Sequence, residues 1–139
     1  MTIIPAIDII NGKCVRLTHG DFAKQKIYND DPVAVAKQFA DAGLQRLHVV
    51  DLDGAKAGKI SNLAVLEKIS AATKLVIDFG GGIKNIEDVE SVLNAGASIV
   101  TIGSLAVRHP ELLEEWLMEF GADKFLIGAD VLDEKVKIS

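Results

Sequence analysis

The sequence has little of what marks a secreted, membrane-bound or nucleic-acid-binding protein. A single cysteine, Cys14, among 139 residues excludes an intrachain disulfide and is typical of a small buried hydrophobic side chain. The net charge is −5 and no basic run occurs, which argues against binding to a nucleic-acid backbone. No signal peptide opens the chain, and the uncharged stretch at 97–107 is too short to span a bilayer, so we expect a cytoplasmic protein with no membrane partner.

Aromatic residues and metal-ligand patterns are scarce as well. Aromatics make up 5% of the chain and hydrophobic residues 49%, so the core must consist mostly of Ile, Val, Leu and Ala, as in strands buried on both faces. His19 and His109 lie in predicted loops, with no second His or Cys at ligand spacing. We therefore expect no metal site. The length allows one domain with a real core but is short for a complete barrel.

Strand-like apolar runs alternate with helical patterns along the chain. Helices are predicted to begin where residue types that favour helix N-termini occur, at Asp31-Pro32, Ser61, Asn85 and Pro110. Thr18–Asp30 and Leu52–Lys59 are predicted to be loops. Strands are predicted at 3–8, 46–51, 74–79, 98–102 and 125–130, with a small strand at 13–17 that follows an Asn-Gly turn.

This alternation predicts an α/β fold with a parallel sheet and right-handed crossovers. An open doubly wound sheet would be favoured by a G-x-G-x-x-G motif after the first strand, and that motif is absent. Carboxylates and glycines at strand C-termini favour a (βα)8 TIM barrel instead. The stretch Ile3–Ile9 is echoed by Phe125–Val131, which indicates two successive copies of one unit. Residues 1–139 are therefore predicted to form an N-terminal half-barrel of about four βα units plus the fifth strand, with the C-terminal half absent.

Glycine-rich turns follow two adjacent predicted strands. Gly80-Gly81-Gly82 lies between a strand and a helix start, and Gly103-Ser104 repeats the arrangement after the next strand. Glycines let the backbone approach a ligand closely, and a helix N-terminus behind them adds positive potential. We expect Gly81, Gly82, Gly103 and Ser104 to bind a phosphate group. The alternative is that both stretches are merely tight turns.

Three aspartates each end a predicted strand. In a barrel, Asp8 and Asp130 would face each other across the mouth, where two carboxylates can divide general-acid and general-base work. Asp51 is compatible with either a loop anchor or a substrate contact.

Other polar residues give weaker signals. The pattern does not decide which way His48 faces, and a structural role is somewhat more typical of such a histidine. Arg16 and Lys84 can each bind an anion, but each can equally be a solvated surface charge.

Several stretches together match one known family, in order and at its spacing. They are Ile4-Pro5-Ala6-Ile7-Asp8, Val15-Arg16-Leu17 with Gly20-Asp21, Val49-Val50-Asp51-Leu52-Asp53-Gly54-Ala55, Gly80-Gly81-Gly82-Ile83, and Gly103-Ser104 with Ala106-Val107. With these stretches the chain closely resembles the N-terminal half of the histidine-biosynthesis isomerase that converts phosphoribosyl-formimino-aminoimidazole-carboxamide ribotide from aminoaldose to aminoketose. The match runs over nearly the whole chain.

The resemblance implies a (βα)8 barrel of two similar halves and an Amadori rearrangement without a cofactor. It implies that Asp8 is the general base and Asp130 the general acid. It implies a small bis-phosphorylated ribotide as substrate, with one phosphate bound by the two glycine turns and the second by the half that is absent here. One departure is Lys84, where arginine is common in the isomerase, because lysine lacks the bidentate fork.

Two alternatives remain open at this point. The cyclase subunit of imidazole-glycerol-phosphate synthase is a sibling, but it typically has Cys-Leu-Asp at Ala6-Ile7-Asp8, Lys at Arg16 and Asn-Thr at Gly103-Ser104. The other alternative is a non-catalytic half-barrel module that binds phosphate. We also expect the 139-residue chain to be inactive, and to self-associate through apolar outer strands at 3–8 and 125–130.

Overall fold

The computed structural model describes residues 3–18, 21–29 and 31–127. They form an α/β fold around a seven-stranded sheet with the order β3-β2-β1-β4-β5-β6-β7. The strands β1, β4, β5, β6 and β7 are parallel neighbours in chain order, whereas β2 pairs with β1, and β3 with β2, in antiparallel fashion. The strand bounds are β1 Ala6–Ile10, β2 Lys13–Thr18, β3 Asp21–Asn29, β4 Arg46–Asp51, β5 Val76–Gly80, β6 Ile99–Ile102 and β7 Phe125–Ile127.

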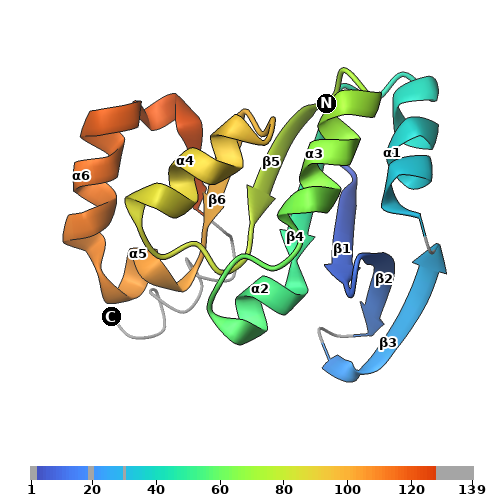
Figure 1. The fold of residues 1–139 in the computed structure, drawn as a ribbon, viewed down its shortest axis with the longest axis horizontal. Helices are drawn as coiled ribbons and strands as arrows, with labels where there is room; N and C mark the ends of the chain where they lie inside the picture. Colours follow the sequence, from blue (N-terminus) through green and yellow to red (C-terminus); the bar gives the residue numbers. More distant parts are fainter. Residues whose placement is uncertain (1–2, 19–20, 30, 128–139) are drawn as a thin grey trace.

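Helices connect the parallel strands and pack on one face of the sheet, as Figure 1 shows for α3 and α4 in front of the strands. Within the described ranges, no helix is long and apolar enough to cross a membrane. The helix bounds are α1 Pro32–Asp41, α2 Leu52–Ala57, α3 Leu63–Ala72, α4 Ile86–Asn94, α5 Ser104–Arg108 and α6 Pro110–Phe120, and a 3-10 turn, η1, covers Ala122–Lys124.

The core lies between this face of the sheet and the helices. Alternate strand residues supply one side of it, because successive side chains of a strand point to opposite faces. The helices supply the other side, for example Leu66 and Ile69 of α3 and Trp116 of α6. Cys14 is 3% exposed within the same cluster, which confirms its prediction as a small hydrophobic residue. The buried apolar residues of β1, β4, β5 and β6 are Ile7, Ile9, Leu47, Val49, Ile77, Phe79, Val100 and Ile102.

Three of the four predicted helix starts are confirmed and one is wrong. Pro110 is the first residue of α6. Asp31 accepts a hydrogen bond from the Val33 amide at 3.0 Å, and Asn85 accepts one from the Asp88 amide at 2.8 Å, so both cap their helices. Ser61 does not cap α3, since the residue before the helix is Asn62 and its side chain makes no capping bond. The Asn62 amide group is instead committed to neighbouring aspartates.

Two segments predicted to be loops contain regular structure. Most of Thr18–Asp30 forms β3, because pairing with β2 satisfies backbone groups that would otherwise lie at an open edge. Most of Leu52–Lys59 forms α2, which Asp51 caps at its start and Gly58, with φ 75°, ends in the left-handed conformation. The sequence also gave no separate signal for α5, which follows Gly103 directly.

The expectation of an open edge at the first strand is wrong for part of its length. β2 covers β1 over Asp8–Ile10, so the outer strand on that side of the sheet is β3. At the opposite edge, β7 is described as far as Ile127, and the remainder of the predicted strand at 125–130 lies outside the described residues.

Candidate functional site

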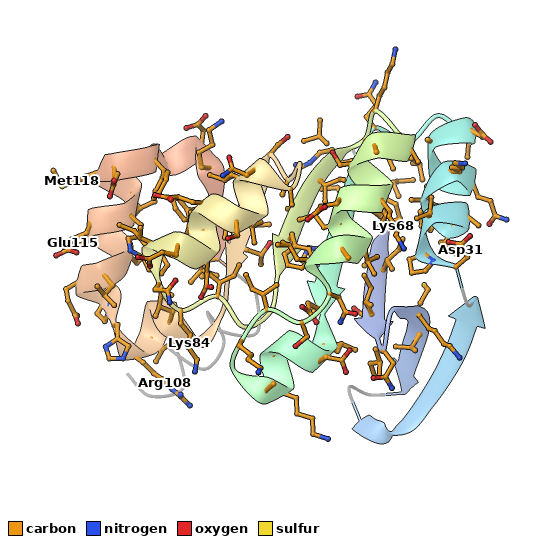
Figure 2. The ribbon with its side chains drawn as sticks, viewed as in Figure 1. Asp31, Lys68, Lys84, Arg108, Glu115 and Met118 are labelled. Carbon is orange, nitrogen blue, oxygen red and sulfur yellow. The ribbon has the colours of Figure 1, made fainter. Side chains whose placement is uncertain are left out.

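The face of the sheet that turns away from the helices forms a concave cavity of about 1050 Å³. Its floor consists of strand residues, and the loops that follow the strands at their C-terminal ends form one side of it. Figure 2 shows Lys84 and Arg108 at this end of the molecule. The lining includes Ala6, His48, Val50, Asp78, Gly80 and Thr101 from the strands, and Gly81, Gly82, Lys84, Gly103 and Arg108 from the segments that follow them.

Strand register sets the relative heights of the polar side chains on this face. Asp8 pairs with Val50, which in turn pairs with Gly80. His48 pairs with Asp78, one pleat nearer the N-terminal ends of the strands. Asp8 alternates with the buried Ile7 and Ile9, so its half-buried side chain lies on the face opposite the helix-covered core. The register therefore places the Asp8 carboxylate above a row that contains His48 and Asp78.

Burial raises the pKa of the Asp8 carboxyl above its ordinary value, because the charged form loses solvation. The positive charge of His48 acts in the opposite direction and lowers the pKa of Asp8. A carboxylate with a raised pKa is a stronger base than a fully solvated one. Asp8 is therefore suited to remove a proton from a bound molecule.

His48 faces the concave surface, a direction that the sequence pattern had left open. Its Nδ1 forms a hydrogen bond with Asp78 Oδ1, and its side chain is 30% exposed. The pKa of His48 is raised, first by this hydrogen bond and further by the charges of Asp78 and Asp8, against an opposing effect of burial. The ring therefore keeps its second proton, and with it a positive charge, up to a higher pH than a free imidazole does.

Sequence reasoning missed Asp78 and the residues around it. Asp78 is 1% exposed, Thr101 Oγ1 donates a hydrogen bond to its Oδ1 at 3.0 Å, and an Arg46 guanidinium nitrogen lies 3.9 Å from its Oδ2. The signal was a single carboxylate inside the apolar strand at 74–79, two residues before the glycine turn. A lone charge at a buried strand position requires a polar partner, and that requirement could have drawn attention to it.

Asp51 is a loop anchor. Its carboxylate is fully buried and accepts hydrogen bonds from the amides of Gly54 at 2.8 Å, Ser61 at 2.7 Å and Asn62 at 2.8 Å. A fourth bond comes from Asn62 Nδ2 at 2.7 Å. These donors occupy the lone pairs that a substrate contact would need.

The glycine turn at 80–82 packs closely against neighbouring backbone. Gly81 has φ 119° and Gly82 has φ 81°, both in the left-handed region that favours glycine. A Cβ on Gly81 would collide with the backbone oxygen of Asp51, and one on Gly82 would lie 2.5 Å from the Lys59 carbonyl carbon. Local packing alone therefore requires glycine here, although both residues line the cavity together with Gly103.

The remaining predicted site residues differ in what the structure says of them. Lys84 lines the cavity and is exposed. Arg16 belongs to β2, and Ser104 is the first residue of α5, directly after Gly103. Asp130 lies outside the described residues. In the described part of the chain, no three His, Cys, Asp or Glu side chains gather in a way that could hold a metal ion.

Comparison with known proteins gives a family for this arrangement. The family model described as "Histidine biosynthesis protein" matches residues 2–139. The chain belongs to this family.

Named relatives within the family are closely similar to the chain. A protein of Parabacteroides distasonis is 54% identical over 137 residues, which is 99% of this chain and 57% of the relative. A protein of Cytophaga hutchinsonii is 58% identical over 128 residues, which is 92% of this chain and 53% of the relative. Both are named 1-(5-phosphoribosyl)-5-((5-phosphoribosylamino)methylideneamino) imidazole-4-carboxamide isomerase. The chain thus spans a little more than half the length of these family members.

Replacing Asp51 should test its role as an anchor in this member of the family. We expect Asp51→Ala to lower the free energy of unfolding by roughly 2–4 kcal/mol, because each buried donor left unpaired costs about 1–3 kcal/mol. Urea unfolding of the chain measures this. The matched control is Asp41→Ala, which removes an exposed aspartate and should change stability by less than about 0.5 kcal/mol. Equal stability of the two variants would contradict the anchor role.

Proposed function

We propose that the chain supplies the N-terminal half of a sugar-phosphate isomerase, which catalyses the Amadori rearrangement of a phosphoribosyl-formimino-aminoimidazole-carboxamide ribotide. The observation that carries the proposal is the half-buried Asp8 carboxylate, whose pKa is raised. The strand register places it beside Val50, on the face of the sheet whose cavity is also lined by Gly81, Gly82 and Gly103. The names of the relatives support the reaction type.

We also propose that the sheet is part of a closed (βα)8 barrel. In an open doubly wound sheet, helices cover both faces. Here the buried apolar side chains of β1, β4, β5 and β6 all belong to one face, and the helices that pack on them share one core. The other face is concave and partly polar. A parallel sheet with helices on the outside and a ligand site at the C-terminal ends of its strands is the arrangement of a barrel.

The proposed chemistry needs one base and one acid. Asp130 protonates the ribose ring oxygen, so that the C1–oxygen bond breaks and the ring opens to a Schiff base. Asp8 then removes the proton from C2, and the electron pair of that C–H bond forms the enolamine, which becomes the aminoketose. No oxidant, reductant or cofactor enters this balance. A base whose pKa is raised by burial suits the second step.

One phosphate group of the substrate is assigned to the loop side of the cavity. Gly81, Gly82 and Gly103 line it, and Lys84 and Arg108 add positive charge nearby. Ser104 follows as part of the same proposed phosphate site. His48 and Arg16 remain proposed substrate contacts, whereas Asp51 is assigned to the loop.

Two alternative functions are less well supported. The relatives are named as isomerases, which favours the isomerase over the cyclase subunit. A phosphate-binding module without catalysis would not need a buried carboxylate beside a histidine. We further propose a cytoplasmic location, without nucleic-acid or membrane partners.

An active-site test requires the complete catalytic surface. The chain can be joined to the part of the Parabacteroides distasonis relative that it does not match, which gives a full-length chimera. In this chimera Asp8→Asn and Asp130→Asn should each lower kcat by about 10²–10⁴, the usual contribution of a general acid or base, with a smaller effect on KM. A steady-state assay of the aminoaldose measures both constants.

Controls make this result specific. Asp41→Asn removes an exposed carboxylate from α1 and should leave kcat unchanged. The unjoined 139-residue chain should show no turnover. Near-native turnover of either active-site variant would show that its assigned role is wrong, and turnover by the unjoined chain would show that the remainder is dispensable.

Binding of phosphate can be followed on the chain itself. Titration with inorganic phosphate should shift the backbone amide signals of Gly81, Gly82, Gly103 and Ser104 together in NMR spectra, because an anion polarises the N–H groups that face it. The amide of Gly43, a glycine that does not line the cavity, serves as the reference. An unchanged spectrum up to millimolar phosphate would count against the site.

We propose, finally, that the 139-residue chain self-associates. Val76, Leu126 and Ile127 are 40%, 43% and 37% exposed, and Ile3 and Ile4 are 66% and 40% exposed. Exposed apolar side chains of this kind favour association. Light scattering at micromolar concentration should therefore give a mass above the 14.9 kDa of one chain. A stable monomer would contradict this proposal.

A further inference from the structure

Asp78 presents a buried carboxylate for which the proposed chemistry has no use so far. It lies on β5, is 1% exposed, and has no role in the glycine turn that follows it. Its partners come from both neighbouring strands: His48 and Arg46 on β4, and Thr101 on β6. Asp78 therefore joins three adjacent strands through side chains on the concave face.

The partners of Asp78 differ in kind from those of a purely structural carboxylate. Asp51, also buried, accepts three of its four hydrogen bonds from backbone amides, and these bonds fix the path of the chain. Asp78 has only side chains as partners, and the closest of them is an ionisable ring. Such an interaction acts on the orientation and protonation of the His48 ring more directly than on the path of the backbone.

The two ring nitrogens of His48 differ in their hydrogen bonding. Nδ1 makes the hydrogen bond to Asp78, and among the described residues Nε2 has no hydrogen-bond partner. The ring lines the cavity, and the register places it one pleat below Asp8. Within the part of the chain that the structure describes, the second nitrogen is thus available to a molecule that occupies the cavity.

We propose that Asp78 is a positioning residue, which accepts a hydrogen bond from Nδ1–H of the His48 imidazolium and orients the ring, so that Nε2–H of the imidazolium can donate a hydrogen bond to a substrate oxygen next to Asp8. The proposal deepens the isomerase function and rests on it. Thr101 and Arg46 hold the Asp78 carboxylate in turn, at 3.0 Å and 3.9 Å.

The charges around His48 agree with this assignment. The charged groups that act on it are Asp78 from β5 and Asp8 from β1. Arg46 from its own strand and the uncharged Thr101 from β6 contact Asp78 instead. The hydrogen bond to Asp78 is the largest cause of the raised pKa of His48. Because the charge of His48 in turn lowers the pKa of Asp8, removal of the Asp78 charge should also change the pKa of Asp8, the proposed base.

The first experiment measures the ring directly in the 139-residue chain. Nitrogen-15 NMR of the histidine side chains reports which ring nitrogens carry protons as the pH is raised. Asp78→Asn keeps an oxygen that can accept from Nδ1–H and Thr101 but removes the charge, whereas Asp78→Leu removes both. We expect the His48 titration to move to lower pH in both variants, and the proton to stay on Nδ1 of the neutral ring only in Asp78→Asn.

Controls separate positioning from folding. Asp41→Asn makes the same chemical change at an exposed site and should leave the His48 titration unmoved. If Asp78→Leu does not fold, Asp78→Asn decides alone, since it is nearly the same size and shape as the native residue. A folded Asp78→Asn variant with the native His48 titration would overturn the proposal.

The second experiment connects the ring to turnover in the full-length chimera. Asp78→Asn should lower kcat by up to about 100-fold, as expected for a misplaced contact, and should move the pH–rate profile in the direction seen by NMR. An inactive native chimera would refute the isomerase function, and with it the catalytic part of this proposal. An active chimera in which Asp78→Asn keeps the native kcat and pH profile would refute the positioning role alone.

Discussion

Four hydrogen bonds converge on the carboxylate of Asp51 at the end of β4, and most of the loop structure around the site depends on them. They fix the start of α2 and the approach to α3. Asn62 extends the network, since its side chain also donates to Asp53 at 2.8 Å and accepts from the Gly12 amide at 3.1 Å. The turn after β1 is thereby tied to the loop after β4. A cavity wall made of loops can keep its shape only when such bonds replace the packing that loops lack.

The two faces of the sheet differ in role: one forms the core and the other carries the candidate site. One is filled by aliphatic side chains and Phe79 and contributes the burial that holds sheet and helices together. The other carries Asp8, His48 and Asp78 in two successive rows. Because the apolar face supplies the stability, the opposite face can hold ionisable groups at altered pKa values that a well-packed core would not tolerate.

Much of the fold could be predicted because the sequence carries local signals for it. The order of the parallel strands followed from the βα alternation, and Asp31 and Asn85 identified their helix starts by capping chemistry. The β3 strand could not be predicted, because polar and apolar residues do not alternate clearly over 21–29 and the strand is stabilised by pairing with β2. The helix α2 was not predicted from the sequence, because it is short and contains a glycine, which is typical of loops.

The placement of a residue was predictable where its own neighbours in sequence give the reason for it. The two glycine turns at the ends of β5 and β6 belong to this group. Asp8 was predicted to end its strand and instead lies inside β1, and the roles of Asp8 and of the glycine turns stay predictions. The role of Asp51 depends on donors up to eleven positions away, and that of Asp78 on partners 23 and 30 positions away on other strands. Pairing across strands is fixed by register, which a pattern of single residues does not contain. Asp78 therefore appeared only when the strands were placed side by side.

The close contact between Gly81 and the Asp51 carbonyl has a consequence for how this site can be redesigned. The two loops touch backbone to backbone, so neither can accept a side chain without displacing the other. Mutational libraries that aim at a new ligand would lose most of their members to misfolding if they varied 80–82. Lys84 and Arg108 are exposed at the rim of the same cavity and have no such constraint. Substitutions that aim to change ligand specificity are therefore better placed at Lys84 and Arg108, with the glycine turn left unchanged.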